Sequence, residues 1–104
     1  MGKALNLRML MSLPKGMDYE LSHQADRFLK RLVKSNKSDV RRILDKIGEI
    51  IEDPYGFEYL RSDGKYRKAR VGSYRVIFTI EEDGSLCLIL LIDLRKNIYK
   101  QFNR

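Results

Sequence analysis

The stretch Tyr66–Phe78, YRKARVGSYRVIF, decides the fold because its pattern is that of a β-hairpin. Residues 66–71 and 74–80 read as two strands, and Gly72–Ser73 is a two-residue link of the type that closes tight hairpins. The stretch also carries four cations, Arg67, Lys68, Arg70 and Arg75. A hairpin needs no such charge to fold, and neighbouring like charges lower stability. The charge therefore points to a function.

Beyond the hairpin, the turn EEDGS leads to a third strand at residues 86–93. This strand is apolar at nearly every position, which predicts a central strand covered on both faces. The following residues, RKNIYKQF, can form a short helix or tail with Ile98, Tyr99 and Phe102 on one side. The hairpin and this strand therefore form the main part of an antiparallel sheet.

Before the hairpin, residues 19–22 are predicted to form a short first strand and two helices follow. The first helix has apolar residues at helical spacing and Ser22 as its N-cap. The second has an apolar stripe from Val40 to Ile51, Ser38 as its predicted N-cap, and Pro54 as its stop. The short link at 35–37 predicts an antiparallel helix hairpin. We therefore expect an α+β fold in the order β-α-α-β-β-β, with the helix hairpin packed on one face of a small, mostly antiparallel sheet.

The length of 104 residues suits one domain, which we assign to residues 17–104, with residues 1–16 as an N-terminal extension before a natural start at Met17. We expect no signal peptide and no membrane partner, because no apolar run approaches the length of a membrane span. The single cysteine, Cys87, favours a reducing cytoplasm and a small buried side chain. The net charge of +7 favours polyanionic partners.

Strand alternation sorts the hairpin side chains by face. Ala69 and Val71 should face the helices, whereas Lys68, Arg70 and Arg75 should converge on the opposite face with Tyr66 beside them. Arg67 falls on the core side, where we expect it at the rim, paired with a carboxylate.

The cations are segregated along the chain. Residues 61–75 hold six cations and one anion, and the last ten residues hold four cations and no anion. Aromatic side chains lie among them, a combination that suits single-stranded nucleic acid through stacking and backbone charge. A solubilising sheet surface is the plain alternative. The candidate RNA-binding residues are Arg61, Lys65, Tyr66, Lys96 and Lys100.

The catalytic inventory is small. The one histidine, His23, starts the first helix away from the basic hairpin and is expected to be a capping or surface residue, and one Cys with one His makes no metal motif. Cleavage of RNA by its own 2′-hydroxyl needs neither metal nor histidine. It needs a proton acceptor, a proton donor and fixed positive charge around the phosphate, which arginine can supply.

The motifs FLKRL, DPY, YRKARVGSYRVIF and LRKNIYK, in this order of elements, resemble the RelE/ParE superfamily of toxin–antitoxin toxins, on the RelE-like side. The resemblance implies a toxin that cleaves mRNA on the ribosome without a cofactor or metal and is neutralised by an antitoxin protein. It also implies catalytic roles for five residues, with Lys68 or Tyr99 as candidate base: Lys68, Arg70, Arg75, Arg95 and Tyr99.

Two alternatives stay open at this point. ParE-like relatives share the fold but act on DNA gyrase, and Leu94 stands where many RelE-like relatives carry histidine. The chain could therefore inhibit gyrase, or it could be a catalytically inactive basic module that binds RNA or an antitoxin.

Overall fold

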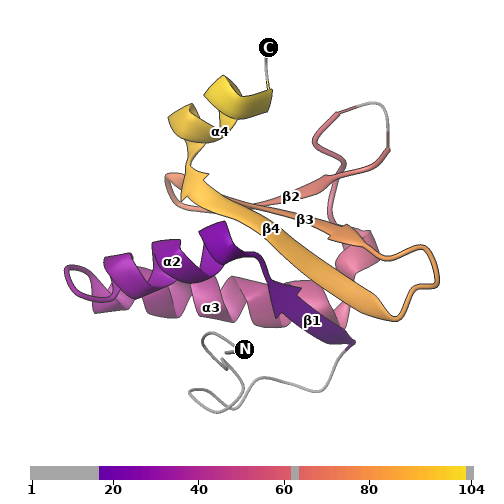
Figure 1. Cartoon of the computed structure of the whole chain (residues 1–104), viewed down its shortest axis with the longest axis horizontal. Coiled ribbons are helices and arrows are strands. Elements are labelled where there is room, and N and C mark those ends of the chain that lie inside the picture. Colours follow the sequence, from indigo (N-terminus) through magenta and orange to yellow (C-terminus); the bar gives the residue numbers. More distant parts are fainter. Residues whose placement is uncertain (1–16, 62–63, 103–104) are drawn as a thin grey trace.

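The computed structural model describes residues 17–61 and 64–102. Figure 1 shows a helix pair lying against one face of a twisted sheet, with a last short helix beyond the end of the central strands. The elements follow in chain order: β1 (Asp18–Leu21), α2 (His23–Leu32), α3 (Lys37–Glu52), a 3₁₀ turn η1 (Pro54–Gly56), β2 (Arg67–Val71), β3 (Tyr74–Ile80), β4 (Leu86–Leu94) and α4 (Arg95–Phe102).

The sheet has four strands in the order β1-β4-β3-β2. The β2–β3 and β3–β4 pairs are antiparallel, whereas β1 pairs with β4 in parallel. The parallel pair arises because the chain crosses over through α2 and α3 before it returns to the sheet. The predicted α+β fold and element order are confirmed, with a mixed sheet that is mostly antiparallel.

The helix starts show one correct and one wrong cap prediction. Ser22 caps α2, because its side chain accepts a hydrogen bond from the backbone N–H of Ala25 at 3.0 Å. The prediction of Ser38 as the cap of α3 is wrong, since Asn36 accepts from the backbone N–H of Asp39. Ser38 instead donates its hydroxyl to the Asn36 side chain at 3.1 Å. Both residue types cap well, and α3 begins one residue before Ser38.

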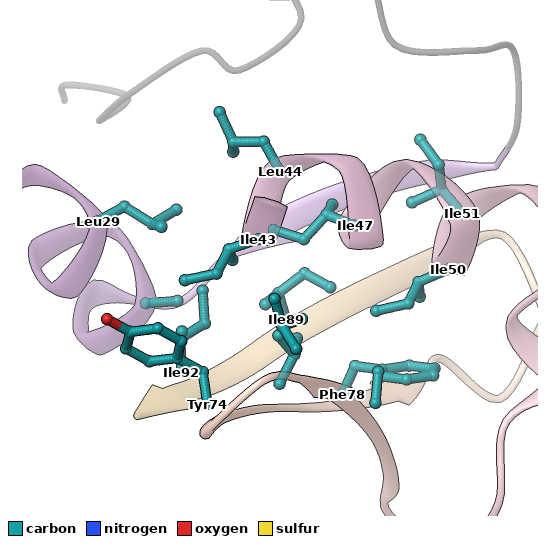
Figure 2. Packing of buried hydrophobic residues seen from close by; sticks show 14 of the residues in the cluster. Leu29, Ile43, Leu44, Ile47, Ile50, Ile51, Tyr74, Phe78, Ile89 and Ile92 are labelled. Carbon is teal, nitrogen blue, oxygen red and sulfur yellow. The ribbon is translucent and has the colours of Figure 1, made fainter. Parts of the chain in front are cut away.

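The core lies between the helix pair and the sheet (Figure 2). Apolar positions of α2 and α3 meet alternate positions of β2, β3 and β4, as helical and strand periods require. Ala69 and Val71 are buried on this face, as predicted. Fully buried members include Leu29, Ile43, Ile47, Ile50, Val76, Phe78, Ile89 and Ile92.

The opposite face of the sheet is covered only in part, so the prediction that β4 is covered on both faces needs correction. The β3–β4 register shifts between Ile77 and Phe78, because Ile77 pairs with Leu91 and Phe78 pairs with Ile89. The strand is central, yet Leu88 and Leu91 are only half-buried. Helix α4 contacts the ends of β3 and β4, and Ile98 is buried there.

Two predictions concern the start of the chain. The proposed extension at residues 1–16 lies outside the described residues. The predicted first strand is found one residue earlier, at Asp18–Leu21. Among the helices of the described residues, none combines the length and the apolar character that a membrane crossing requires.

Candidate nucleic-acid interface

The tight turn of the β2–β3 hairpin is the centre of the candidate site. Val71 pairs with Tyr74 across the link Gly72–Ser73. Gly72 has φ +58, a left-handed value, as the first central residue of a type II′ turn requires. The carbonyl of Ser73 accepts a hydrogen bond from the backbone N–H of Arg95 at 2.8 Å. The turn therefore joins the hairpin to the start of α4.

Two arginines face each other beside this turn. Arg70 and Arg75 are direct cross-strand partners, and Lys68 pairs with Ile77 on the same face, away from the helices. The predicted convergence of the three cations on this face agrees with the register. Like charges opposite each other destabilise a sheet, so this pair lowers stability.

Arg75 is held firmly despite its charge. The residue is only 9% exposed, and its Nη1 donates to the carbonyls of Gly72 at 3.0 Å and Tyr74 at 2.8 Å. Burial lowers the pKa of the guanidinium from its ordinary value, and the charges of Arg70 and Arg95 lower it further, while Tyr99 opposes the shift. An arginine stays charged at neutral pH despite such a shift. The site thus holds one fixed, partly desolvated positive charge.

We call the open space beside the turn the cation hollow; its volume is about 690 Å³. Within the described part of the chain, none of its four cations has a carboxylate oxygen within 4.0 Å. Asp93 is the cross-strand partner of Arg75, but its Oδ1 accepts from the backbone N–H of Leu94 and from the Asn97 side chain. The hollow is lined by Arg70, Gly72, Ser73, Arg75, Leu94, Arg95 and Lys96.

Helix α4 brings the last predicted residues to the hollow. The Arg95 guanidinium lies over the Tyr99 ring, 4.8 Å from its centroid, a cation–π contact one turn along the helix. Tyr99 is half-buried and opposes the lowering of the Arg75 pKa. Lys100 is exposed on the same helix. The amino end of α4 adds a partial positive charge beside Arg95.

The other predicted residues lie farther along β2. Lys68 is half-buried two residues before Arg70 and does not line the hollow. Arg61 and Lys65 are exposed near the start of the strand, with the Lys65 Nζ 5.2 Å from the centroid of the Tyr66 ring. The structure therefore brings Arg70, Arg75, Arg95, Lys96 and Tyr99 together, whereas Arg61, Lys65, Tyr66 and Lys68 lie on or before β2 outside the lining of the hollow.

Among the described residues, no carboxylate oxygen lies within 4.0 Å of Arg67, so the predicted carboxylate pair is not found there. Arg67 Nη1 donates to the carbonyl of Phe57 at 2.6 Å, and its Nη2 donates to the Tyr59 hydroxyl at 2.8 Å. The guanidinium also lies over the Tyr59 ring, 4.0 Å from its centroid. The reason is the path of the chain before β2, since Tyr59 bridges to Arg67 and places aromatic rings there instead of acids.

Sequence reasoning missed a residue from the helix layer beside the turn. The Arg42 guanidinium in α3 lies so close to Gly72 that a Cβ built on the glycine would stand 2.8 Å from its Nη2. Its only sequence signal is the spacing of three residues from Asp39, which makes an ion pair at 3.2 Å.

Two side chains with possible chemistry lie away from this site. His23 is exposed at the first position of α2, as predicted. Cys87 is fully buried, and burial raises the pKa of its thiol to about 12, which keeps the thiol protonated. Among residues 17–61 and 64–102, no three His, Cys, Asp or Glu side chains gather as a metal site would require.

Comparison with known proteins identifies the class. Residues 19–99 match the family model described as the ParE toxin of the type II toxin–antitoxin system parDE. The chain therefore belongs to this family and is a toxin of a toxin–antitoxin system within the RelE/ParE superfamily. The resemblance drawn from the motifs is confirmed.

Individual relatives come from archaea and bacteria. The candidate toxin RelE4 of Methanocaldococcus jannaschii is 27% identical over 86 residues, which cover 81% of this chain and 92% of that protein. The toxin–antitoxin complex RelBE2 of Mycobacterium tuberculosis matches with a TM-score of 0.63 and 21% identity, covering 78% of this chain and all of that chain. The archaeal RelE–RelB complex of Pyrococcus horikoshii matches with a TM-score of 0.62 and 24% identity, covering 78% of this chain and 97% of that chain. These structural likenesses support the fold.

Proposed function

We propose that this toxin is an endoribonuclease that cleaves mRNA on the ribosome without a metal ion. The observation that carries the proposal is the cation hollow, where Arg70, Arg75, Arg95 and Lys96 converge without a carboxylate within 4.0 Å among the described residues. Convergent unpaired charge is costly to a fold and suits a phosphodiester, whose charge increases toward the transition state.

The reaction that fits is attack of the 2′-hydroxyl on the adjacent phosphorus. A base takes the proton of the 2′-hydroxyl, the O2′–P bond forms and the P–O5′ bond breaks. An acid gives a proton to the departing 5′-oxygen, which leaves a 2′,3′-cyclic phosphate and a free 5′-hydroxyl. Arg75 stabilises the pentacoordinate phosphate, because its guanidinium is fixed by the two carbonyls of the turn.

The proton acceptor is assigned to Tyr99 or Lys68. Tyr99 has the better position, because it lies under Arg95 beside the hollow, whereas Lys68 lies two residues along β2 from Arg70. Arg61, Lys65, Tyr66 and Lys68 then form the approach for the RNA backbone, with Lys96 and Lys100 on the side of α4. A positioned acid–base group contributes roughly 10²–10⁴-fold in rate.

We further propose a cognate antitoxin as partner and the cytoplasm as the site of action. Two of the structural relatives are complexes of a toxin with its antitoxin. A segment with acidic and apolar residues would complement the cation hollow and the half-buried Leu88 and Leu91, which lie farther along β4.

Purified protein added to translating ribosomes tests the proposal. Cutting of the mRNA is expected, mapped by primer extension, with 2′,3′-cyclic phosphate ends. Arg75→Ala should lower the rate at least about 10²-fold, as removal of one donor to a developing charge does elsewhere. Arg31→Ala, which removes an exposed arginine from α2, is the matched control. Intact mRNA with folded protein would overturn the proposal.

A second candidate is inhibition of DNA gyrase, because the matching family model is that of a ParE toxin. It predicts loss of supercoiling by gyrase while mRNA stays intact. A third candidate is a non-catalytic RNA-binding module. It predicts salt-sensitive RNA binding, with log K falling by about 0.7 per phosphate contacted for each tenfold rise in salt, and no cutting.

A further inference from the structure

A polar cluster on the helix side of the sheet is joined to the hairpin turn. The Tyr74 hydroxyl donates to Asp39 Oδ2 at 2.7 Å, although the two residues are far apart in sequence. The Asn36 side chain donates to the same oxygen at 2.9 Å, and Arg42 donates to Oδ1 at 3.2 Å. One carboxylate of α3 thus binds three donors, and one of these donors comes from the sheet.

The second link is between Arg42 and Gly72. The space that a Cβ on Gly72 would need is occupied by the end of the Arg42 side chain. The same guanidinium donates a hydrogen bond to Asp39. Arg42 therefore lies against Gly72 on one side of the turn. The hydrogen bond from Tyr74 to Asp39 fixes the residue that ends the turn. We call Asp39, Arg42 and Tyr74 the turn clamp.

The opposite side of the same turn carries the cation hollow. The carbonyls of Gly72 and Tyr74 hold Nη1 of Arg75, and the carbonyl of Ser73 holds the backbone N–H of Arg95. The three carbonyls that hold Arg75 Nη1 and the Arg95 backbone belong to residues 72–74, and the turn clamp includes Tyr74 and touches Gly72. A shift of the turn would move Arg75 and the start of α4 together.

We propose that Asp39 is a positioning residue for the cation hollow and acts through Tyr74 and Arg42 on the turn. Asp39 does not line the hollow itself. Its effect is to hold Arg70, Arg75 and Arg95 at fixed spacing against their mutual repulsion. The proposal rests on the assignment of the hollow as a phosphate site, but it does not require that the RNA be cut.

A variant of Arg42 also removes a positive charge, so the test needs a control that removes an equal charge elsewhere on α3. Arg41 is the adjacent exposed arginine of the same helix, and the atoms nearest to a Cβ on Gly72 all belong to Arg42. Arg41→Ala therefore removes equal charge without touching the clamp. Tyr74→Phe changes no charge and keeps the ring, which packs edge-on against Phe28 with centroids 6.0 Å apart.

The experiment uses the full chain and inorganic phosphate as probe, at a temperature where each variant is fully folded by circular dichroism. Phosphate is titrated while the arginine Nε–Hε signals of ¹⁵N-labelled protein are followed by NMR. Tyr74→Phe and Arg42→Ala should weaken phosphate binding about five- to tenfold relative to Arg41→Ala, and the Arg75 signal should shift in the free protein. Asp39→Asn should likewise weaken phosphate binding and shift the Arg75 signal.

The possible results distinguish the turn clamp from the proposed cleavage of mRNA. Unchanged phosphate affinity and an unchanged Arg75 signal in Tyr74→Phe would overturn the clamp, even if the variant melts at a lower temperature, because a purely structural role predicts that result. Absence of phosphate binding by the unaltered protein would overturn it as well. Phosphate binding that depends on the clamp, together with intact mRNA, would support the clamp and remove only the proposed cleavage.

Discussion

Two arginines of one hairpin, Arg67 and Arg75, have opposite environments. Arg67, at the start of β2, donates to a carbonyl and a tyrosine hydroxyl and lies over the Tyr59 ring. Arg75, beside the turn, bonds only turn carbonyls with Nη1 and faces Arg70 and Arg95. Arg67 therefore stabilises the fold through its contacts, whereas Arg75 adds charge repulsion to it.

The difference shows how to separate a structural cation from a functional one. Both residues are arginines within a few positions of each other, so charge alone does not distinguish them. Each donates two hydrogen bonds, so the difference lies in the other neighbours: Arg67 lies over aromatic rings, whereas Arg75 faces two further cations and suits an anionic ligand. Substitutions at the turn and at each arginine test this contrast.

The largest expected effect is on stability, from a methyl group at the turn. Gly72→Ala forces an alanine into φ +58 and displaces the flexible end of Arg42, which would lie 2.8 Å from the new Cβ. From the backbone strain and the lost contact of Arg42 with the turn we expect a loss of about 2–3 kcal/mol in the free energy of unfolding. Gly64→Ala is the control at the other end of β2, since its φ is +72 but the nearest atom is 3.9 Å away. Urea unfolding should show a loss of about 1–2 kcal/mol there. Equal losses would mean that the contact of Arg42 with the turn contributes nothing.

Replacement of Arg67 is expected to cost somewhat less. Arg67→Gln removes the donors to Phe57 and Tyr59 and the cation–π contact, and we expect a loss of about 1–2 kcal/mol, measured by urea unfolding. Arg31→Gln on the exposed side of α2 is the control and should change little. A stability equal to that of the unaltered protein would remove Arg67 from the structural side of the comparison.

The turn clamp should have a pH signature. The hydrogen bond to Asp39, with burial and the Asp39 charge, raises the pKa of Tyr74 above its ordinary value of 10.0. A raised pKa in the folded state gives stability that is fully present below about pH 10 and is lost as pH rises through the folded value. The stability difference between the unaltered protein and Tyr74→Phe should therefore be constant near neutral pH and shrink above about pH 10. A difference that stays constant throughout would contradict the hydrogen bond.

The smallest effect is a gain. Arg70→Gln relieves the repulsion across the Arg70–Arg75 pair, and we expect an increase of about 0.2–1 kcal/mol in the free energy of unfolding. The gain should decrease with added salt, because screening already weakens the repulsion. A loss of stability in thermal unfolding would show that Arg70 has a partner that offsets its charge.

Much of this fold follows from local patterns. Alternation sorted Lys68, Arg70 and Arg75 from Ala69 and Val71, because a strand places successive side chains on opposite faces whatever it pairs with. Helical spacing found α2 and α3, and the motifs found the family.

The features that sequence reasoning missed depend on residues distant in the chain. The partners of Arg67 come from the segment before β2, and the bond between Asp39 and Tyr74 joins α3 to the sheet. The register shift in β4 leaves Leu91 half-buried, which an unbroken apolar run does not reveal. The choice of Asn36 over Ser38 as cap concerns two equally suitable residues, and only the exact start of α3 decides it.

The proposed division of roles is that Arg75 stabilises the phosphate during RNA cleavage, whereas Arg67 stabilises the fold. The direct test measures mRNA cutting on translating ribosomes and urea unfolding for Arg75→Gln and Arg67→Gln side by side. We predict that Arg75→Gln keeps its stability within about 1 kcal/mol and loses cutting by at least about 10²-fold, while Arg67→Gln loses stability and still cuts where it is folded. Cutting by folded Arg75→Gln at the rate of the unaltered protein would contradict the account.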